Sequence, residues 1–227
     1  MDRPDASLFA RWRFLTLTLL ICAWLLLAPM LTADWRVQLL LEGFLAVTVM
    51  FTVWANPHWK RLRNALIALW LLSLTGTLLS ILTADTAWRW SRTLELMTLV
   101  PLMALLAAGI LAFVLRERTL TLDSIFATVA AYLLVAVMFA QIYLCLLAWR
   151  PDSFSMPVEV ASRPMHLLQA DITYFSLVTL ATVGYGDILP ATPTARTLAM
   201  IEAVSGQFYI AIVVALFVGM YSSQRRG

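Results

Sequence analysis

The chain has 227 residues, of which 62% are hydrophobic and 13% charged, and its mean hydropathy is +0.85. Because soluble domains carry about a quarter charged residues, this composition excludes a water-soluble protein. The net charge of +3 comes from basic residues dispersed between apolar runs, a distribution that indicates membrane topology and no nucleic-acid partner.

Apolar runs of about 20 residues, the length that crosses a hydrocarbon core roughly 30 Å thick, recur along the chain. They predict an all-α membrane protein with six transmembrane helices. Asp123 is expected to cap the fifth helix, and Thr192 followed by Pro193 is a typical start for the last. The expected helices cover about residues 14–33, 37–55, 65–83, 94–115, 124–149 and 193–222.

The segment between the last two helices has a different pattern. Residues 150–164 are polar and contain three prolines, which indicates an exposed loop. Residues 168–181 are apolar but too short to cross a bilayer, so we expect a re-entrant segment. Non-helical backbone at such a depth is tolerated only where protein or water surrounds it.

Charge placement indicates an orientation. In a chain that crosses six times, ten of the 16 lysines and arginines lie on the side of the N-terminus and six on the other. Because basic residues favour the cytoplasmic side, we expect both termini in the cytoplasm. The segment that follows residue 181 then faces the outside.

Cysteine and histidine usage gives little support to a metal site or a disulfide. Cys22 and Cys145 both fall in apolar runs, where buried thiols are the simplest interpretation. His58 and His166 complete the inventory of nitrogen ligands. We therefore expect no cofactor, and no paired catalytic groups within the helices indicate an enzyme.

Directly after the short apolar segment, Thr182–Gly186 read TVGYG and Asp187 follows. Two glycines within three residues free the backbone to aim successive carbonyls at one axis. Thr182 and Val183 are β-branched and stiffen the remaining positions, and Thr182 adds a hydroxyl oxygen.

This motif is the selectivity-filter sequence of the potassium channel superfamily, and from about Asp123 onward the chain resembles the pore module of that family. The resemblance implies an outer helix, a re-entrant pore helix, the filter and an inner helix. It divides the chain into a four-helix N-terminal membrane domain, residues 1–118, and a pore domain, residues 119–227. Carbonyls of Val183, Gly184 and Tyr185, with the oxygens of Thr182, would then replace the hydration shell of K⁺, the transported ion.

Four further residues match the surroundings of the family's filter. Asp171 falls in the first turn of the expected pore helix, where a carboxylate complements free amides. Tyr174 and Phe175 match the aromatic pair that packs beside the filter, and Tyr174 is placed to donate a hydrogen bond to Asp187. Asp187 would also form an acidic ring at the outer mouth.

The expected inner helix contains an unusual carboxylate and a glycine. Where some relatives carry a pore-helix glutamate this chain has Val178, and Glu202 lies instead in the inner helix, as filter support or as a satisfied polar contact near the outer interface. Gly206 stands at the family spacing for a gating hinge, although close packing would equally explain a glycine. One face of this helix gives the cavity-lining candidates Gln207, Ile210, Val214 and Val218.

The fourth helix argues against voltage gating. Arg89 and Arg92 stand three residues apart, but the next positions in that register are Glu95 and Thr98. A voltage sensor needs several charges that move through the field, and this helix is neutral after Glu95. We expect a channel that is not classically voltage-gated.

Because each chain supplies one filter strand, the expected assembly is a homotetramer. It would lie in a lipid bilayer, with a bacterial inner membrane as the expected location, since small prokaryotic channels are the most similar members. A weakly selective cation channel is the first alternative. A non-conducting membrane scaffold or regulatory subunit that keeps a filter-like fold is the second.

Overall fold

A computed structural model describes residues 4–27, 43, 46–50, 60–82, 88–117, 119–163 and 167–225. Helices dominate this part of the chain, as expected for an all-α protein. The helices are α1 (Pro4–Leu27), α3 (Lys60–Leu82), α4 (Trp88–Val114), α5 (Leu122–Trp149), η1 (Pro151–Ser153), α6 (Val158–Ala161), α7 (Leu168–Leu180) and α8 (Pro193–Gln224). Two short strands, β1 (Phe154–Ser155) and β2 (Leu189–Pro190), pair antiparallel.

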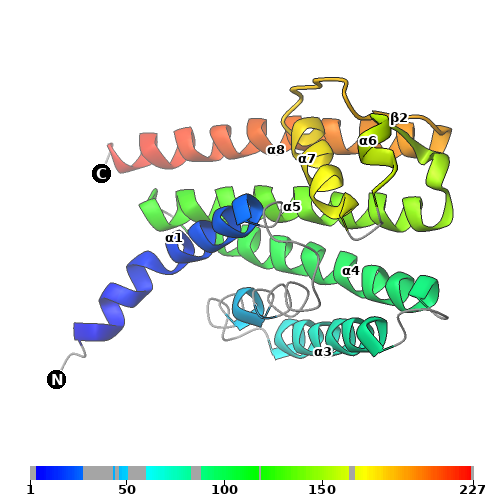
Figure 1. The fold of residues 1–227 in the computed structure, drawn as a ribbon. Helices are drawn as coiled ribbons and strands as arrows, with labels where there is room; N and C mark the ends of the chain where they lie inside the picture. Colours follow the sequence, from blue (N-terminus) through cyan, green and yellow to red (C-terminus); the bar gives the residue numbers. More distant parts are fainter. Residues whose placement is uncertain are drawn as a thin grey trace.

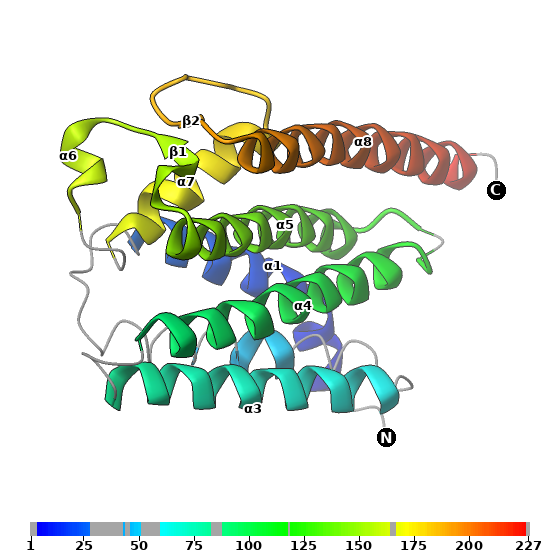
Figure 2. The same ribbon diagram turned by 90° about the vertical axis from the view of Figure 1, so that its right-hand side faces the viewer.

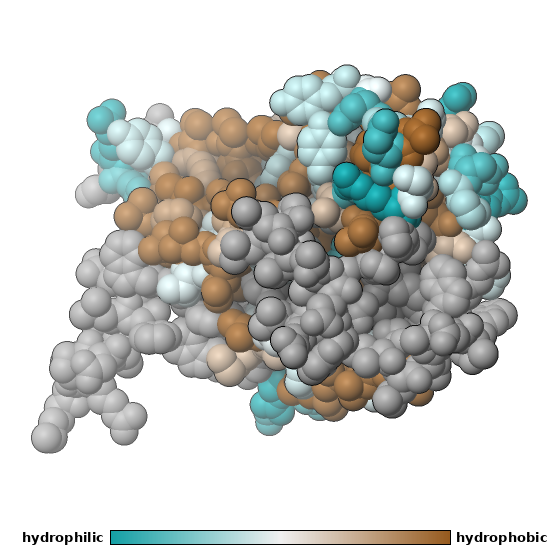
Figure 3. All heavy atoms as spheres, viewed as in Figure 1, coloured by the Kyte–Doolittle hydropathy of each residue, from teal (hydrophilic) through white to brown (hydrophobic). Residues whose placement is uncertain are grey.

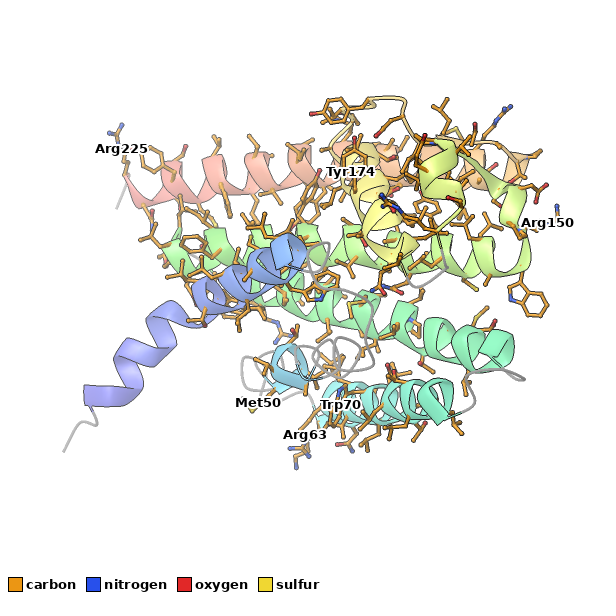
Figure 4. The ribbon with its side chains drawn as sticks, viewed as in Figure 1. Met50, Arg63, Trp70, Arg150, Tyr174 and Arg225 are labelled. Atoms are coloured by element: carbon orange, nitrogen blue, oxygen red, sulfur yellow. The ribbon has the colours of Figure 1, made fainter. Side chains whose placement is uncertain are left out.

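The long helices stack in layers. α3 packs against α4 and α4 against α5, while α8 lies beyond α5 at the edge farthest from α3 (Figures 1 and 2). α1 crosses α5 on another side, and α7 is held at one end between α5 and α8. α5 and α8 run antiparallel, so that Arg150 and Arg225, which follow their last turns, lie at opposite ends of the molecule (Figure 4).

Four of the described helices are long and apolar enough to cross a membrane. Their apolar windows are Leu62–Leu79, Met97–Val114, Leu122–Trp149 and Pro193–Gln224, and α1 contributes a shorter apolar stretch, Phe14–Leu26. Most of the expected second helix, residues 37–55, lies outside the described residues, although residues 46–50 are helical. A membrane protein built from helices is therefore supported, and the count of six crossings stays a prediction.

Figure 3 shows how side chains are distributed on one face of the molecule. Hydrophobic side chains cover α5 and α8 between two hydrophilic ends. One hydrophilic group surrounds α6 and the start of α7, and the other lies at the C-terminal end of α8. This distribution is typical of helices that cross an apolar layer with both ends in polar surroundings.

Three helices begin at least five residues earlier than the sequence predicted, and one of them is α3, which starts at Lys60 rather than near residue 65. α1 starts at Pro4 rather than near residue 14, because proline is compatible with a first helical turn and no glycine or second proline interrupts the residues that follow. α4 starts at Trp88 rather than near residue 94. The charged and aromatic residues at these starts did not exclude a helix, because their helix propensities are only slightly lower than that of alanine.

The expected cap of α5 is also wrong by two residues. Thr121 is the N-cap: its hydroxyl accepts a hydrogen bond from the Ser124 amide at 3.1 Å, and Ser124 Oγ accepts one from the Thr121 amide at 3.0 Å. This reciprocal pair satisfies two amides at once. Asp123 instead accepts a hydrogen bond from the Phe14 amide at 2.9 Å and joins α5 to α1. The predicted start of α8 is confirmed, because Thr192 Oγ1 accepts from the Ala195 amide.

The buried side chains form two clusters that share α5. One cluster joins α1, α3, α4 and the first half of α5, with Leu17, Leu66 and Leu106 fully buried. The other joins the second half of α5 to β1, α7 and the start of α8. The proposed boundary near residue 118 falls between α4 and α5, two helices that pack directly against each other.

Candidate functional site

The segment Thr182–Gly186 leaves the C-terminal end of α7 with an alternating backbone. The φ angle is +56° at Thr182, +62° at Gly184 and +83° at Gly186, whereas Val183 and Tyr185 have negative φ. Alternation between left- and right-handed conformations turns successive amides to one side of a chain and successive carbonyls to the other. Glycine adopts the left-handed conformation freely, but a β-branched threonine does so at a cost, which is common at functional sites.

The same segment stands at the edge of the subunit. In both ribbon views the loop that follows α7 arches away from α3 and α4, above the beginning of α8 (Figures 1 and 2). The side chains of Val183 and Tyr185 are 52% and 71% exposed. Its inner end is fixed, because the Thr182 and Val183 amides donate to the carbonyls of Thr179 and Val178, each at 2.9 Å.

The aromatic pair of α7 is split between the filter and the core. Tyr174 stacks on Tyr185, with ring centroids 6.3 Å apart and an interplanar angle of 3°. It lies on the side of the molecule that carries the filter loop (Figure 4). Phe175 is buried and meets Tyr143 and Phe154 edge to face, at 5.3 and 5.2 Å. The pair thus links the filter segment to the cluster beneath it.

Two acidic residues flank this arrangement. Loss of solvent contact raises the pKa of Tyr174, and a hydrogen bond to Asp187 and the charge of that carboxylate raise it further. Tyr174 therefore stays protonated and remains a donor toward Asp187. Asp171 lies in the first turn of α7, as expected, and forms an ion pair with Arg163 at 3.0 Å that the sequence did not predict.

Glu202 is completely buried where α8 meets α5 and α7. Tyr143 donates a hydrogen bond to Glu202 Oε2 at 2.6 Å, and Ser176 Oγ contacts Glu202 Oε1. Ser176 Oγ also lies 2.7 Å from the carbonyl oxygen of Ala136. Glu202 thus has polar partners on both neighbouring helices and lies behind the pore-helix candidate.

Gly206 lies at the closest approach of α8 to α7. A Cβ at this position would overlap the carbonyl oxygen of Leu180, the last residue of α7, and would lie 3.0 Å from its carbonyl carbon. The same carbonyl oxygen accepts a hydrogen bond from the Tyr132 hydroxyl at 3.0 Å. α8 is continuous through Gly206, and this contact accounts for the glycine. A gating hinge there stays a prediction.

The remaining inner-helix candidates divide into one contact residue and an exposed apolar face. The side-chain amide of Gln207 donates to Thr182 Oγ1 at 3.0 Å and so meets the inner end of the filter segment. Ile210, Val214 and Val218 are 45–60% exposed along the same helix. Their role as a cavity lining stays a prediction.

Sequence reasoning missed the tyrosines that hold this region together. Tyr132 and Tyr143 of α5 donate to Leu180 and Glu202, and Tyr209 of α8 donates to the carbonyl of Thr128 at 2.6 Å. A tyrosine inside an apolar helix usually requires a partner for its hydroxyl. That signal was present, but the sequence does not say which group on another helix is the partner.

Comparison with known proteins places this geometry in a family. A family model described as "Ion channel" matches residues 131–223, from within α5 to the last turn of α8. Protein LctB of Bacillus caldotenax is 36% identical over 95 residues, covering 42% of this chain and 70% of that protein. Protein LctB of Geobacillus stearothermophilus is 34% identical over 116 residues, covering 51% and 84%.

The name of a third relative specifies potassium. The inward rectifier potassium channel Kirbac3.1 of Paramagnetospirillum magnetotacticum is 35% identical over 57 residues, which cover 25% of this chain and only 19% of that protein. No solved structure gives a significant match. The fold and the matches define a membrane ion channel. More specifically, the chain belongs to the potassium-channel type of the ion channel family.

Proposed function

We propose that the protein is a potassium-selective channel that conducts K⁺ passively through a homotetrameric pore. The observation that carries the proposal is the alternation of φ along Thr182–Gly186, which would turn successive backbone carbonyls to one side of the chain. Carbonyls of Val183, Gly184 and Tyr185 and the oxygens of Thr182 would coordinate the dehydrated ion. Rings of such oxygens are how potassium channels replace the hydration shell.

The exposed surface of α8 supports an assembly of several copies. One chain contributes a single row of oxygens, whereas a ring around an ion requires several. The filter segment and α8 expose Val183, Tyr185 and most of the apolar residues of the helix. A continuous exposed apolar surface along a helix usually marks an interface or a lipid contact. Four copies arranged around the filter would cover one such face and leave the other to lipid.

The dimensions of α7 suit a re-entrant pore helix. Its 13 residues would extend about 20 Å at 1.5 Å per residue, less than a hydrocarbon core of about 30 Å. Asp171 in the first turn complements the amides at the N-terminal end of α7. The C-terminal end at Leu180, which carries partial negative charge, would face the ion pathway and favour a cation there. Asp187 would add negative charge at the outer mouth.

Orientation follows from the antiparallel course of α5 and α8. The short elements and filter segment between them gather at one end, and the start of α5 and the end of α8 lie at the other (Figure 1). We place the filter end outside and both termini in the cytoplasm, because the connections assigned to the inner side carry more lysine and arginine. The surroundings would be a cell membrane, such as a bacterial inner membrane.

The direct test is ion flux into vesicles that contain the purified, reconstituted protein. We expect potassium-driven uptake that barium blocks, with sodium unable to substitute. Equal flux of both ions would instead establish a weakly selective cation channel. Absence of flux from a folded oligomer would favour a scaffold or regulatory subunit. Cross-linking in detergent, with subunits counted by mass, tests the tetramer independently of conduction.

A pair of glycine variants connects the flux to the filter backbone. Gly184→Ala should abolish selective uptake, because alanine is strained at φ +62° although nothing occupies the space its Cβ would fill. Gly219→Ala is the matched control: it lies in α8 and its Cβ would also meet nothing within 4 Å. If both variants retained full potassium selectivity, the filter assignment would be wrong.

A further inference from the structure

The buried polar cluster around Glu202 raises a question of proton count. Three oxygen-to-oxygen contacts meet there: Tyr143 to Glu202 Oε2, Ser176 to Glu202 Oε1, and Ser176 to the carbonyl oxygen of Ala136. Each hydrogen bond requires one proton, and the Ala136 carbonyl can only accept. The two hydroxyls bring two protons to three contacts. One proton is missing if Glu202 is a carboxylate.

A protonated Glu202 supplies the missing donor. Its Oε1–H donates to Ser176 Oγ, and the Ser176 hydroxyl donates to the Ala136 carbonyl. The Tyr143 hydroxyl donates to Oε2, which remains a pure acceptor. All three contacts are then ordinary hydrogen bonds, and each buried polar group of the cluster has a partner.

The ionised alternative is physically expensive at this position. Glu202 is 0% exposed, and both of its described partners are neutral hydroxyl groups. A buried carboxylate is costly unless a cation or several donors compensate its charge. If Glu202 were ionised, the single Ser176 proton could form a hydrogen bond with either Glu202 or the Ala136 carbonyl, but not with both. The other oxygen would then lie against Ser176 Oγ with no proton between them, which is repulsive.

We propose that Glu202 carries a proton in the conducting channel, and that this proton makes Glu202 a positioning residue for the filter. Its role in conduction rests on the proposed function, whereas its protonation rests on the cluster alone. Glu202 lies on α8, Ser176 on α7, and Tyr143 and Ala136 on α5, so the protonated chain of hydrogen bonds ties the pore-helix candidate to both long helices. α7 leads directly into Thr182.

The groups that face Glu202 are hydroxyls, so Glu202 is the member of the cluster that is expected to change its protonation state first as pH rises. α5 contributes the Tyr143 and Tyr132 hydroxyls and α7 contributes Ser176, while the ring of Tyr209 on α8 packs tilted against Tyr132 with centroids 5.3 Å apart. Each is a neutral hydroxyl donor at ordinary pH. Alkaline conditions that remove the Glu202 proton should therefore loosen α7 and reduce selective flux, while acidification to neutral pH should restore it.

Infrared spectroscopy of the full-length protein in detergent tests the protonation itself. Wild type at neutral pH should show the carbonyl stretch of a protonated carboxylic acid, and Glu202→Gln should remove that band. Ser176→Ala should shift the band, because the acid loses its acceptor, but should not abolish it. Glu159→Gln is the matched control, since Glu159 is exposed on α6 and its replacement should leave the band unchanged.

Flux then tests the positioning role. Glutamine places an N–H donor and a carbonyl acceptor where a protonated glutamate has its O–H and C=O, so Glu202→Gln should conduct within about twofold of wild type and lose the decline at alkaline pH. Glu202→Ala leaves buried hydroxyls unpaired and should lower selective flux about tenfold or more. If glutamine preserves selective flux and alanine does not, the hydrogen bonds of the side chain matter, and not only the space that it fills.

The outcomes separate this inference from the proposed function. A band that Glu202→Gln removes, in a protein with no potassium flux, would support the protonated cluster and overturn the channel. Wild type without the band, together with a Glu202→Gln protein less stable than wild type, would overturn the protonated cluster whatever the flux. If the glutamate variants fail to fold, the Ser176→Ala band shift still decides: no shift contradicts the proposal.

Discussion

The two faces of α5 hold their neighbours by different means. Toward α1 and α4 the helix presents mainly small and aliphatic side chains, including Ala127, Ala130 and Leu134. Two hydrogen bonds to α1, accepted by the Asp123 carboxylate and the Phe126 carbonyl, supplement this mainly apolar cluster. Toward α7 and α8 it presents Tyr132 and Tyr143, whose hydroxyls bond to named atoms on those helices. Apolar packing fixes proximity, whereas directional hydrogen bonds fix a position. The side of α5 that faces the proposed filter has the second kind, as a filter of fixed width would require.

Gly206→Ala should have the largest effect on the side that faces the proposed filter. The added methyl would overlap the Leu180 carbonyl oxygen, and backbone cannot yield as a flexible side chain can. We expect a loss of about 3 kcal/mol or more in stability and loss of potassium flux. Thermal unfolding in detergent and vesicle uptake measure the two. Gly219→Ala in the same helix should change stability by less than about 1 kcal/mol; similar losses in both variants would refute the close-contact explanation.

Leu106→Ala should weaken the apolar face without altering ion choice. Leu106 of α4 is completely buried, and the cavity left by its truncation should cost about 2–4 kcal/mol in unfolding free energy. The potassium-to-sodium flux ratio of the folded fraction should stay at the wild-type value. Leu115→Ala, at an exposed position, provides the control. A changed flux ratio in Leu106→Ala would show that the two faces of α5 are not separable.

Tyr132→Phe should have a smaller effect on stability and a visible one on the filter. It removes the donor to the Leu180 carbonyl at 3.0 Å but keeps the ring packed against Tyr209, so we expect a loss of about 1 kcal/mol in stability. The selectivity ratio should fall, because the end of α7 loses a fixed contact. Tyr221→Phe, which alters an exposed tyrosine beside Arg225, should leave both quantities unchanged. An unaltered ratio in Tyr132→Phe would weaken the positional argument.

Arg163→Gln should have the smallest effect. The ion pair of Arg163 with Asp171 is partly exposed, and such pairs contribute about 0–1 kcal/mol. Any difference between variant and wild type should shrink as salt rises toward about 1 M, where charges are screened within about 3 Å. Urea unfolding at low and high salt measures this. A loss that persists in high salt would assign Arg163 a packing role instead.

Local signals in the sequence predicted a large part of this structure. The TVGYG segment, the short apolar helix before it and the Thr192 cap all depend on residues within a few positions of one another. Apolar length together with the expected caps located α5 and α8 to within a few residues. The family model and the relatives confirm the resemblance that was read from Thr182–Gly186. The sequence was sufficient for this step because the motif is short, continuous and specific.

The remaining features depend on contacts between distant residues. Asp123 is of a residue type that often caps helices, but Thr121 and Ser124 form the cap of α5. Asp123 instead accepts a hydrogen bond from Phe14, 109 residues away. Tyr143 and Glu202 are 59 residues apart. A buried glutamate predicts that some partner exists, whereas only the packing of α5 against α8 selects which one. The β1–β2 pair is two residues long and leaves no periodic pattern in the sequence.

That small sheet has a consequence for the order of assembly. Phe154 pairs with Pro190, and the Ala191 amide donates to the Ser153 carbonyl at 2.8 Å, so the chain between them closes into a ring within one subunit. The ring contains α6, α7 and the filter segment. Closing it lowers the conformational freedom of that segment without any contribution from another copy. In the proposed tetramer, each monomer would therefore bring a partly preorganised filter segment, and oligomerisation would be closer to docking than to coupled folding.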